Sequence, residues 1–523
     1  MARPYFRYRQ GLTYDDLSEG FSFGVPERFN LGSACCDPHP PDAVALVSVA
    51  RDGSVEHATY GEMSDRASRL AGALGRSGIS AGDRVGVVAP QSLETGIAHL
   101  GIWKLGAVSI PLASLFGPDA LRFRLTDSGA RTAIVSPGNV DKVREAVETL
   151  PIIEIGAEFD ALISGEPIDA PADTAAEDPV FLIYTSGTTG PPKGALHAHR
   201  TLFGHLPAFE LYYDFAPQPG DVIWTPADWA WIGALMDVVI PAWYYGMTVL
   251  TDESDFDPHH AVRLMADHDV TLAFLPPTAL KMMRAADVDG SDLRLRSIFT
   301  GGEPLGEEML SWAYERLGCA VNEGYGQTEA NIVVGNSSRV WPVRPGSMGR
   351  AIPGHDVQVQ DDDGGRLIDD IGEIVVRSPD PVMMLRYWNR PDATEAKFRD
   401  GWLLTGDLGR EDADGYLWFE SRKDDVISSM GYRIGPGEIE ESLMGHPAVA
   451  MCAVIGIPDE VRGQVPAAFV VLREGFTESA DLASELQNHV RTRLAAHEVP
   501  RRVSFIDDLP RTTTGKIMRR ALR

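Results

Sequence analysis

Hydroxyl, glycine and lysine residues are concentrated in the segment YTSGTTGPPKG, residues 184–194. Glycines leave the backbone amides unhindered, and successive N–H groups can form a concave site for an anion. A Walker A loop would need four residues between its glycines and a Gly-Lys-Ser/Thr ending. Here Gly187 and Gly190 are separated by two residues, and Lys193 is followed by glycine. The segment therefore predicts a phosphate-binding loop of another kind.

Five further segments have a similar density of special residues: GGEP (301–304), NEGYGQTE (322–329), GWLLTGDL (401–408), ESRKDDVISSMGYRIGPGEIE (420–440) and LPRTTTGKIMRR (509–520). Each one alone is compatible with an ordinary turn. In this order and spacing the set resembles the adenylate-forming enzymes, and the resemblance covers nearly the whole chain. It implies that a carboxylate is joined to the α-phosphate of ATP with release of pyrophosphate. A thiol then takes the acyl group, and AMP leaves.

The resemblance also implies a nucleotide site. It assigns ATP and AMP binding to Thr185, Ser186, Gly187, Thr188, Thr189, Gly190, Lys193, Gly302, Glu303, Pro304, Glu323, Gly324, Tyr325, Gly326, Gln327, Thr328, Asp407, Arg422 and Lys516. Within this set, Tyr325 would stack near the adenine and Thr328 would contact the α-phosphate. Asp407 would accept hydrogen bonds from both ribose hydroxyls, as a carboxylate can, and Arg422 would donate to the same ribose.

Four residues match the family's catalytic positions. Lys516 would bridge the substrate carboxylate and the α-phosphate, Glu329 would ligate Mg²⁺, and Thr328 and Lys193 would hold phosphate oxygens. Fixed cations and a metal suit a step that brings an anion to a polyanion. In this family the domain that carries the lysine rotates after adenylation, about a hinge that matches Asp424. The rotation would expose the adenylate to the thiol.

The thiol is expected to be that of coenzyme A. The segment SSMGYRIGPGEIE is similar to the wall of the pantetheine tunnel in acetyl- and medium-chain acyl-CoA synthetases. The matching CoA residues are Met430, Gly431, Tyr432, Arg433, Arg462 and Arg491. Met430 stands where a serine is common, and the last two arginines are also compatible with a solvated surface. A carrier-protein thiol is the alternative acceptor. No serine-bearing carrier segment follows Lys516, which argues against a peptide-synthetase module.

The acyl pocket is expected to accept more than acetate. Acetate-specific members have Trp at the position of Gly326 and Val at that of Gly301. Two glycines there predict an open tunnel for a medium-chain, branched or aromatic acid. DWAWIGALMD (228–237) matches a further pocket segment, with Trp231, Ile232 and Gly233 as lining residues. Trp229 and Met236 are additional candidates, and Met236 is more typical of core packing.

Strands and helices alternate through most of the chain, which predicts an α/β fold with a mostly parallel sheet. Strands are expected at 43–50, 83–90, 131–137, 180–183, 270–277 and 295–302, and helices at 93–106 and 258–269. A chain of 523 residues exceeds one core. We predict an N-terminal domain at 1–422 and a small α+β domain at 423–523. The latter has strands at 449–459, 465–474 and 501–510 and a helix at 480–497.

The composition of the chain argues against some classes of binding partner. A net charge of −28 argues against nucleic acid. Apolar runs are too short for a membrane span, and the N-terminus lacks the features of a secretory signal. The four cysteines lack zinc-ligand spacing, so no metal–thiolate site is expected. A reducing cytoplasm is the simplest setting for the chain. The expected ligands are ATP, Mg²⁺, coenzyme A and a small carboxylic acid, and a homodimer is the assembly considered.

Two other functions compete with the ligase. GFSFG (20–24) matches the G-x-S-x-G elbow of serine hydrolases, but no strand is expected before it. A non-catalytic nucleotide-binding homologue is the second. The presence of Lys516, Glu329 and Asp407 argues against it.

Overall fold

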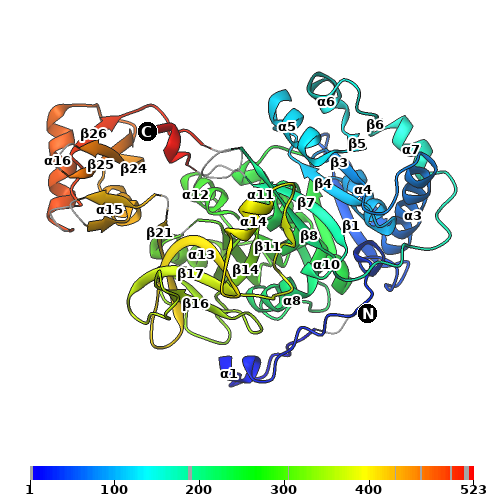
Figure 1. The fold of residues 1–523 in the computed structure, drawn as a ribbon, viewed down its shortest axis with the longest axis horizontal. Coiled ribbons are helices and arrows are strands. Elements are labelled where there is room, and N and C mark those ends of the chain that lie inside the picture. Colours follow the sequence, from blue (N-terminus) through cyan, green and yellow to red (C-terminus); the bar gives the residue numbers. More distant parts are fainter. Residues whose placement is uncertain are drawn as a thin grey trace. The chain divides into compact units, whose positions relative to one another are not determined.

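The computed structural model of the chain describes residues 4–185, 191–303, 305–423, 425–429, 432–459, 462–494, 498–511 and 517–522. The backbone forms two compact units. The first comprises 1–185, 191–357 and 376–403, and the second comprises 358–375 and 404–523. Figure 1 shows helices and strands alternating along the chain, as its colours run from blue to red.

One sheet of the first unit has the strand order β18-β8-β7-β4-β3-β5-β6. Its strands are β3 (Arg84–Val88), β4 (Val108–Leu112), β5 (Thr132–Val135), β6 (Ile152–Glu154), β7 (Pro179–Thr185), β8 (Lys193–Ala198) and β18 (Arg386–Tyr387). The strands from β7 to β6 run parallel, whereas β8 and β18 are antiparallel additions at one edge. The predicted phosphate loop thus lies between β7 and β8.

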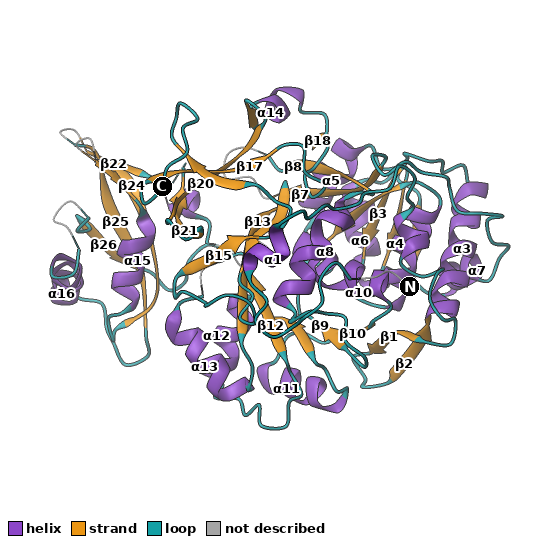
Figure 2. Cartoon of the chain, turned by 90° about the horizontal axis from the view of Figure 1, so that it is seen from below, coloured by secondary structure: helices purple, strands orange, loops and turns teal. Residues whose placement is uncertain are grey.

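Helices cover this sheet. They are α3 (Tyr60–Arg76), α4 (Leu93–Lys104), α5 (Pro118–Ser128) and α6 (Val140–Ala146). Leu121, Leu125 and Val143 of α5 and α6 pack against strand residues such as Ile110. Helix α4 contacts β3 and β4 and is itself covered by α3. Figure 2 shows these helices gathered around β3. Parallel strands buried by helices are the arrangement that the alternating sequence predicts.

The other sheet of the first unit follows the order β15-β14-β13-β12-β11-β9-β10-β1-β2. Its strands are β1 (Val44–Val49), β2 (Val55–Thr59), β9 (Val222–Trp224), β10 (Thr248–Asp252), β11 (Leu272–Phe274), β12 (Ser297–Gly301), β13 (Val321–Gln327), β14 (Ala330–Gly335) and β15 (Ser347–Ala351). The strands from β1 to β13 are parallel, and β14 turns back along β13.

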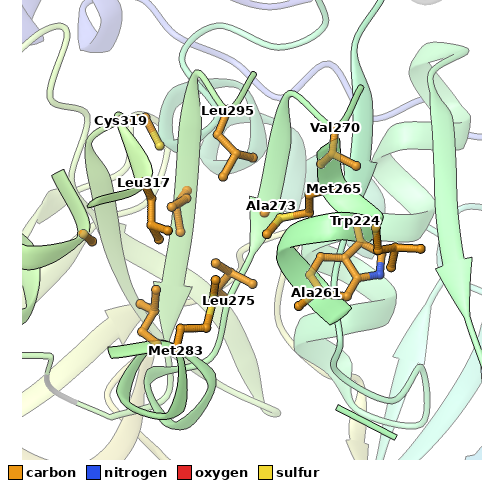
Figure 3. Packing of buried hydrophobic residues seen from close by; sticks show 14 of the residues in the cluster. Trp224, Ala261, Met265, Val270, Ala273, Leu275, Met283, Leu295, Leu317 and Cys319 are labelled. Atoms are coloured by element: carbon orange, nitrogen blue, oxygen red, sulfur yellow. The ribbon is translucent and has the colours of Figure 1, made fainter. Parts of the chain in front are cut away.

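A hydrophobic core forms between this sheet and the helices α11 (Pro258–Asp267), α12 (Pro277–Ala285) and α13 (Glu307–Leu317). Figure 3 shows Trp224, Met265, Leu275 and Met283 among the side chains that fill the space between helices and strands. Helices α8 (Thr201–Tyr212) and α10 (Ile240–Tyr245) also contact the sheet. Burial of this apolar surface fixes the strand ends that carry the motifs.

The second unit holds a strand group and a small α+β part. The strand group is β16 (Val357–Gln360), β17 (Ile371–Arg377), β20 (Trp402–Glu411) and β21 (Tyr416–Arg422). The α+β part has the strands β22 (Ile427–Ser429), β23 (Tyr432–Ile434), β24 (Val449–Asp459), β25 (Gly463–Leu472) and β26 (Arg502–Phe505), with helices α15 (Pro436–Met444) and α16 (Ala480–Arg491). Ile439, Leu443 and Leu486 bury the two helices against this sheet.

The predicted α/β fold class is confirmed. The strand expected at 449–459 has those bounds, and the helices expected at 93–106 and 258–269 each end two residues earlier than predicted. The boundary predicted between residues 422 and 423 stays a prediction.

Candidate active site

The β13–β14 hairpin presents the motif NEGYGQTE. Strand β13 ends at Gln327, which pairs with Ala330, so Thr328 and Glu329 form the connecting turn. On the other side, Gly301 of β12 lies in parallel register with Gly324. The segments GGEP and GYGQTE, about twenty residues apart in sequence, therefore meet at the carboxyl ends of neighbouring strands, where α/β sheets build ligand sites.

A partly buried carboxyl, that of Glu323, belongs to this strand edge. Glu323 accepts a hydrogen bond from the backbone N–H of Leu305 at 3.1 Å, which ties the segment after GGEP to β13. Burial raises the pKa of Glu323 above the usual range of a carboxyl. Gly302 has a φ of +94°, a conformation that favours glycine. Tyr325, Gln327 and Glu303 are partly exposed, as residues that face a ligand must be.

Glu329 is held by a tyrosine that the sequence analysis did not identify. The side chain of Glu329 is buried, and the hydroxyl of Tyr387 donates a hydrogen bond to its Oε1. The Nζ atom of Lys193 lies 5.2 Å from the centroid of the Tyr387 ring, within the range of a cation–π contact. Tyr387 thus joins the predicted metal ligand to the lysine at the end of the phosphate loop.

Backbone pairing positions Tyr387. Strand β18 pairs with β8, with Tyr387 opposite Ala195. The N–H of Trp388 donates to the Gly194 carbonyl at 2.7 Å. The N–H of Met384 donates to the Glu329 carbonyl at 2.9 Å. One segment therefore fixes both motifs, and the only sequence signal for it is the aromatic pair in LRYWNRP.

The predicted ribose pair lies in the second unit. The antiparallel register of β20 and β21 places Asp407 opposite Arg422. Nη1 of Arg422 donates to Oδ1 of Asp407 at 2.7 Å, and the N–H of Asp407 donates to the Thr405 hydroxyl at 3.1 Å. The Asp407 side chain is 6% exposed. The two residues assigned to one ribose by resemblance are thus direct neighbours.

The predicted CoA arginines lie in the α+β part of the second unit. Arg462 follows β24, and its N–H donates to Oδ1 of Asp459 at 2.9 Å. Arg491, the last residue of α16, is exposed and donates to Asn488. Neither contact conflicts with a role in binding a polyanion.

The residues around Lys516 are anchored from both sides. Arg511 and Ile517 form an antiparallel bridge that flanks residues 512–516. Arg519 forms ion pairs with Glu440 at 2.7 Å and Asp425 at 3.5 Å.

Several predicted positions lie outside the described residues: Ser186, Gly187, Thr188, Thr189, Gly190, Pro304, Asp424, Met430, Gly431 and Lys516. The side chains of Tyr432 and Arg433 are also outside the description, although both belong to β23. Their roles stay predictions.

The predicted acyl-pocket segment forms the start of a helix. Ile232 and Gly233 lie in α9 (Ile232–Ala234), and Trp231 is the residue that precedes the helix as its N-cap. The Trp231 ring packs edge-on against the Phe116 ring, with 5.9 Å between the ring centroids. A Cβ atom at Gly233 would lie 3.5 Å from the Phe274 ring, an ordinary contact distance. By contrast, Trp229 and Met236 are fully buried, and Trp229 packs edge-on against Trp243. These two positions have the environment of core residues.

The glycines at 301 and 326 have a structural reason that differs from the tunnel interpretation. A Cβ atom on Gly326 would lie 2.0 Å from the backbone nitrogen of Ile332 in the adjoining strand. On Gly301 it would lie 2.8 Å from the Gly324 carbonyl oxygen. Backbone therefore fills the direction in which each side chain would start. Close strand approach accounts for glycine at both positions, and their role in the acyl pocket stays a prediction.

The serine hydrolase interpretation is wrong. Ser22 is exposed and follows helix α1 (Tyr14–Ser18) and a turn, where the nucleophile elbow requires a strand. The histidine ring packed against Phe23 is His355, whose two ring nitrogens are already hydrogen-bonded to Asp380 and to the Gly204 carbonyl.

Among the residues that the structure describes, no three His, Cys, Asp or Glu side chains form a metal cluster. Over the same described residues, no helix is long and apolar enough to cross a membrane.

Comparison with known proteins agrees with this arrangement. The chain matches the family model of the AMP-binding enzyme over residues 34–388 and that of the AMP-binding enzyme C-terminal domain over 438–516. An uncharacterized acyl-CoA ligase of Bacillus subtilis (strain 168), YtcI, is 34% identical over 493 residues, 92% of each chain. The acetyl-coenzyme A synthetase of the same organism is 33% identical over 489 residues, covering 90% of this chain and 85% of its own.

The fold of the chain is also similar to that of a solved structure. The benzoate CoA ligase from Burkholderia xenovorans LB400 superposes with a TM-score of 0.84 at 28% identity, covering 95% of this chain and 100% of the other. The motif order, the fold and the relatives thus point to one chemistry. The chain belongs to the AMP-binding enzyme family and is an acyl-CoA synthetase, an AMP-forming ligase of carboxylic acids and coenzyme A.

Proposed function

We propose that Mg²⁺·ATP binds across the loop before β8 and the β13–β14 turn, where the metal is held by Glu329. The contact between Tyr387 and Glu329, with Lys193 beside the same ring, carries this proposal. An oriented carboxylate and a lysine that contact the same tyrosine support a shared role in binding one polyphosphate. Mg²⁺ would supply positive charge that neutralises the phosphates.

The two half-reactions use different residues. In the first, a carboxylate oxygen attacks the α-phosphorus, and the bond to the bridging oxygen breaks so that pyrophosphate leaves. Lys516 and Thr328 would stabilise the charge that develops on the α-phosphate. Asp407 and Arg422 would hold the ribose. In the second half-reaction the sulfur of coenzyme A attacks the acyl carbon, and AMP leaves with the electron pair of the broken bond.

Coenzyme A is the proposed acceptor within this chemistry, and Arg462 and Arg491 are proposed to contact its nucleotide end. Their positive charge suits the phosphates of CoA. Met430, Gly431, Tyr432 and Arg433 would line its pantetheine arm, and a carrier-protein thiol is the alternative. A cytoplasmic setting and a homodimer complete the proposal, and the four buried free cysteines agree with a reducing compartment.

The proposed acid is larger than acetate: medium-chain, branched or aromatic. Trp231 and the Phe274 ring beside Gly233 offer apolar walls, which suit such an acyl group. The similarity to a benzoate CoA ligase supports an aromatic acid, whereas the similarity to an acetyl-coenzyme A synthetase supports a small one. The residues at positions 301 and 326 are glycine, where acetate-specific members carry Val and Trp.

A pyrophosphate assay with ATP, Mg²⁺, coenzyme A and one of four acids tests the proposal. We expect kcat/KM to be higher for butyrate, hexanoate or benzoate than for acetate. A preference for acetate would remove the larger-acid proposal and leave the ligase chemistry intact. No acid-dependent pyrophosphate from a wider panel of acids would contradict the ligase proposal itself.

A further inference from the structure

A fully buried carboxyl lies one helical turn beyond the predicted acyl-pocket residue Gly233. Asp237 belongs to the π-helical turn η2 (Leu235–Val239), which continues helix α9. Asp237 is 1% exposed. Short π-helical turns inside helices are frequent at functional sites. A buried carboxyl in such a turn requires a physical explanation, because an uncompensated charge there is costly.

A chain of hydrogen bonds fixes the protonation of the groups behind Asp237. Nδ1 of His205 lies 2.7 Å from the Thr201 carbonyl oxygen, so this nitrogen must carry the hydrogen. Burial lowers the pKa of His205 to about 4, so the ring is neutral and its Nε2 is an acceptor. Nδ2 of Asn331 lies 3.2 Å from that Nε2 and donates to it. The second N–H of the same amide donates to Oδ1 of Asp237 at 2.7 Å.

Among the residues that the structure describes, the hydrogen bond from Asn331 to Oδ1 is the only one made to the Asp237 carboxyl, and none is made to Oδ2. Burial raises the pKa of Asp237 well above the usual range of a carboxyl, which favours the neutral acid. Since Oδ1 accepts from Asn331, the proton belongs on Oδ2. A buried hydroxyl without an acceptor costs free energy.

Oδ2 lies beside Gly233, a residue that the sequence analysis assigns to the acyl pocket. It lies 3.6 Å from the place that a Cβ atom on Gly233 would occupy, and the Phe274 ring lies at a similar distance from that place. The other titratable groups near Asp237 are Tyr212 and Tyr213, both fully buried. The Tyr212 hydroxyl donates to the backbone carbonyl of Asp237 at 3.3 Å, leaving Oδ2 untouched.

We propose that Asp237 determines specificity by donating a hydrogen bond from Oδ2 to an uncharged oxygen on the acyl chain. The inference rests on the proposed function, because it requires the acid to bind beside Gly233. It deepens that function by naming the substrate class. The preferred acids carry a hydroxyl or carbonyl oxygen away from their carboxylate, in place of a purely apolar tail. Sites built to pair with a polar substrate group discriminate strongly against analogues that lack it.

The test compares acids of one chain length in the pyrophosphate assay: hexanoate, hexanoates with a hydroxyl at carbon 3, 4, 5 or 6, 5-oxohexanoate and 6-aminohexanoate. We expect the wild type to favour at least one oxygen-bearing acid over hexanoate by about tenfold or more in kcat/KM. In Asp237→Leu the preference for the oxygen-bearing acid over hexanoate should vanish. In Asp237→Asn part of it should remain, because an amide also donates.

Asp228→Asn is the matched control. This carboxyl precedes helix α9, and Oδ1 accepts from the Ala230 N–H at 2.8 Å. Burial raises the pKa of Asp228 to about 6. The same change from carboxyl to amide should leave the preference among acids unaltered.

Three outcomes would overturn the inference. The first is that the wild type has the same kcat/KM for all the acids. The second is that both Asp237 variants lose the same fraction of kcat/KM for every acid. A preference for 6-aminohexanoate that grows with pH is the third, because it would show an ionised Asp237. If wild type instead released no pyrophosphate with any acid, the proposed function itself would fail. Because the wild-type panel is decisive alone, an unfolded Asp237→Leu protein does not prevent the test.

Discussion

The hydroxyl of Tyr387 in β18 donates a hydrogen bond to Oε1 of Glu329 in the β13–β14 turn, although the two residues are 58 positions apart in sequence. Tyr387 therefore acts as a positioning residue for the proposed metal ligand. A hydrogen bond to a charged group contributes about 1.5–3 kcal/mol. We predict that Tyr387→Phe raises the Mg²⁺ concentration for half-maximal rate by about tenfold, since 1.4 kcal/mol corresponds to a factor of ten. The KM for the acid should not change.

Tyr245→Phe provides the control, because the Tyr245 hydroxyl donates to Glu210 in another buried pair of the same unit. That variant should change thermal stability without changing the Mg²⁺ requirement. An unaltered Mg²⁺ requirement in Tyr387→Phe would show that the tyrosine does not position the metal ligand.

The ribose assignment predicts a loss of nucleotide affinity in Asp407→Ala. Two hydrogen bonds to a charged acceptor contribute about 1.5–3 kcal/mol each, so ATP should bind at least about tenfold more weakly by calorimetry. Glu411→Gln is the matched control, since Glu411 lies on the same strand and pairs with Arg366. If both variants kept the wild-type affinity for ATP, Asp407 would not belong to the site.

The two glycines near the acyl pocket predict opposite responses to the same substitution. At Gly326 a methyl group would collide with the backbone of Ile332, so Gly326→Ala should lower the melting temperature, at an overpacking cost of about 1–3 kcal/mol. At Gly233 a methyl group fits. Gly233→Ala should keep the melting temperature and reduce kcat/KM for hexanoate more than for acetate. Equal melting temperatures of the two variants would contradict the close strand approach at Gly326.

Buried histidines predict acid sensitivity. Burial lowers the pKa of His99 to about 3 and that of His205 to about 4. The folded state keeps these rings neutral, whereas the unfolded state protonates them below about pH 6.5. Their contribution to stability is therefore complete above pH 6.5 and decreases as pH falls toward 4, by up to about 1.36 kcal/mol per pH unit for each ring.

His99→Gln isolates one of these rings. The His99 ring stacks on the Trp103 ring, with 5.3 Å between the ring centroids. Replacing His99 removes one titratable group from the buried core. The melting temperature of the variant should fall less steeply than that of the wild type between pH 7 and pH 5. Parallel curves would show that His99 does not titrate on unfolding.

Sequence patterns predicted the elements better than the contacts between them. The run VAMCAVIGIPD is a continuous apolar stretch, so the bounds of β24 could be read directly. Motif resemblance also paired Asp407 with Arg422, which the register of β20 and β21 brings together. Tyr387 was missed because its contact with Glu329 spans 58 residues and follows from the addition of β18 to a sheet edge. No local periodicity encodes such an addition.

The glycines show a second limit of prediction from sequence, because a feature can be visible in the sequence while its structural cause is not. At Gly326 the sequence identifies a missing side chain, but only the structure shows that the backbone of a neighbouring strand occupies its place. Similarly, no spacing rule marks Asp237 as special, because its significance lies in burial, a π-helical turn and the amide of Asn331. Both are properties of packing between distant segments.

The central claim is that acid activation and thiol transfer are separate half-reactions and that Lys516 serves only the first. The most direct measurement compares wild type, Lys516→Ala and Lys281→Ala, an exposed lysine of α12, in two assays. One measures acyl-AMP formed from acid and ATP, and the other measures acyl-CoA formed from supplied acyl-AMP and coenzyme A. We predict that Lys516→Ala loses acyl-AMP formation by at least about a hundredfold and keeps thiol transfer, while Lys281→Ala resembles wild type in both. An equal loss of both half-reactions in Lys516→Ala, or wild-type rates in both, would contradict the account.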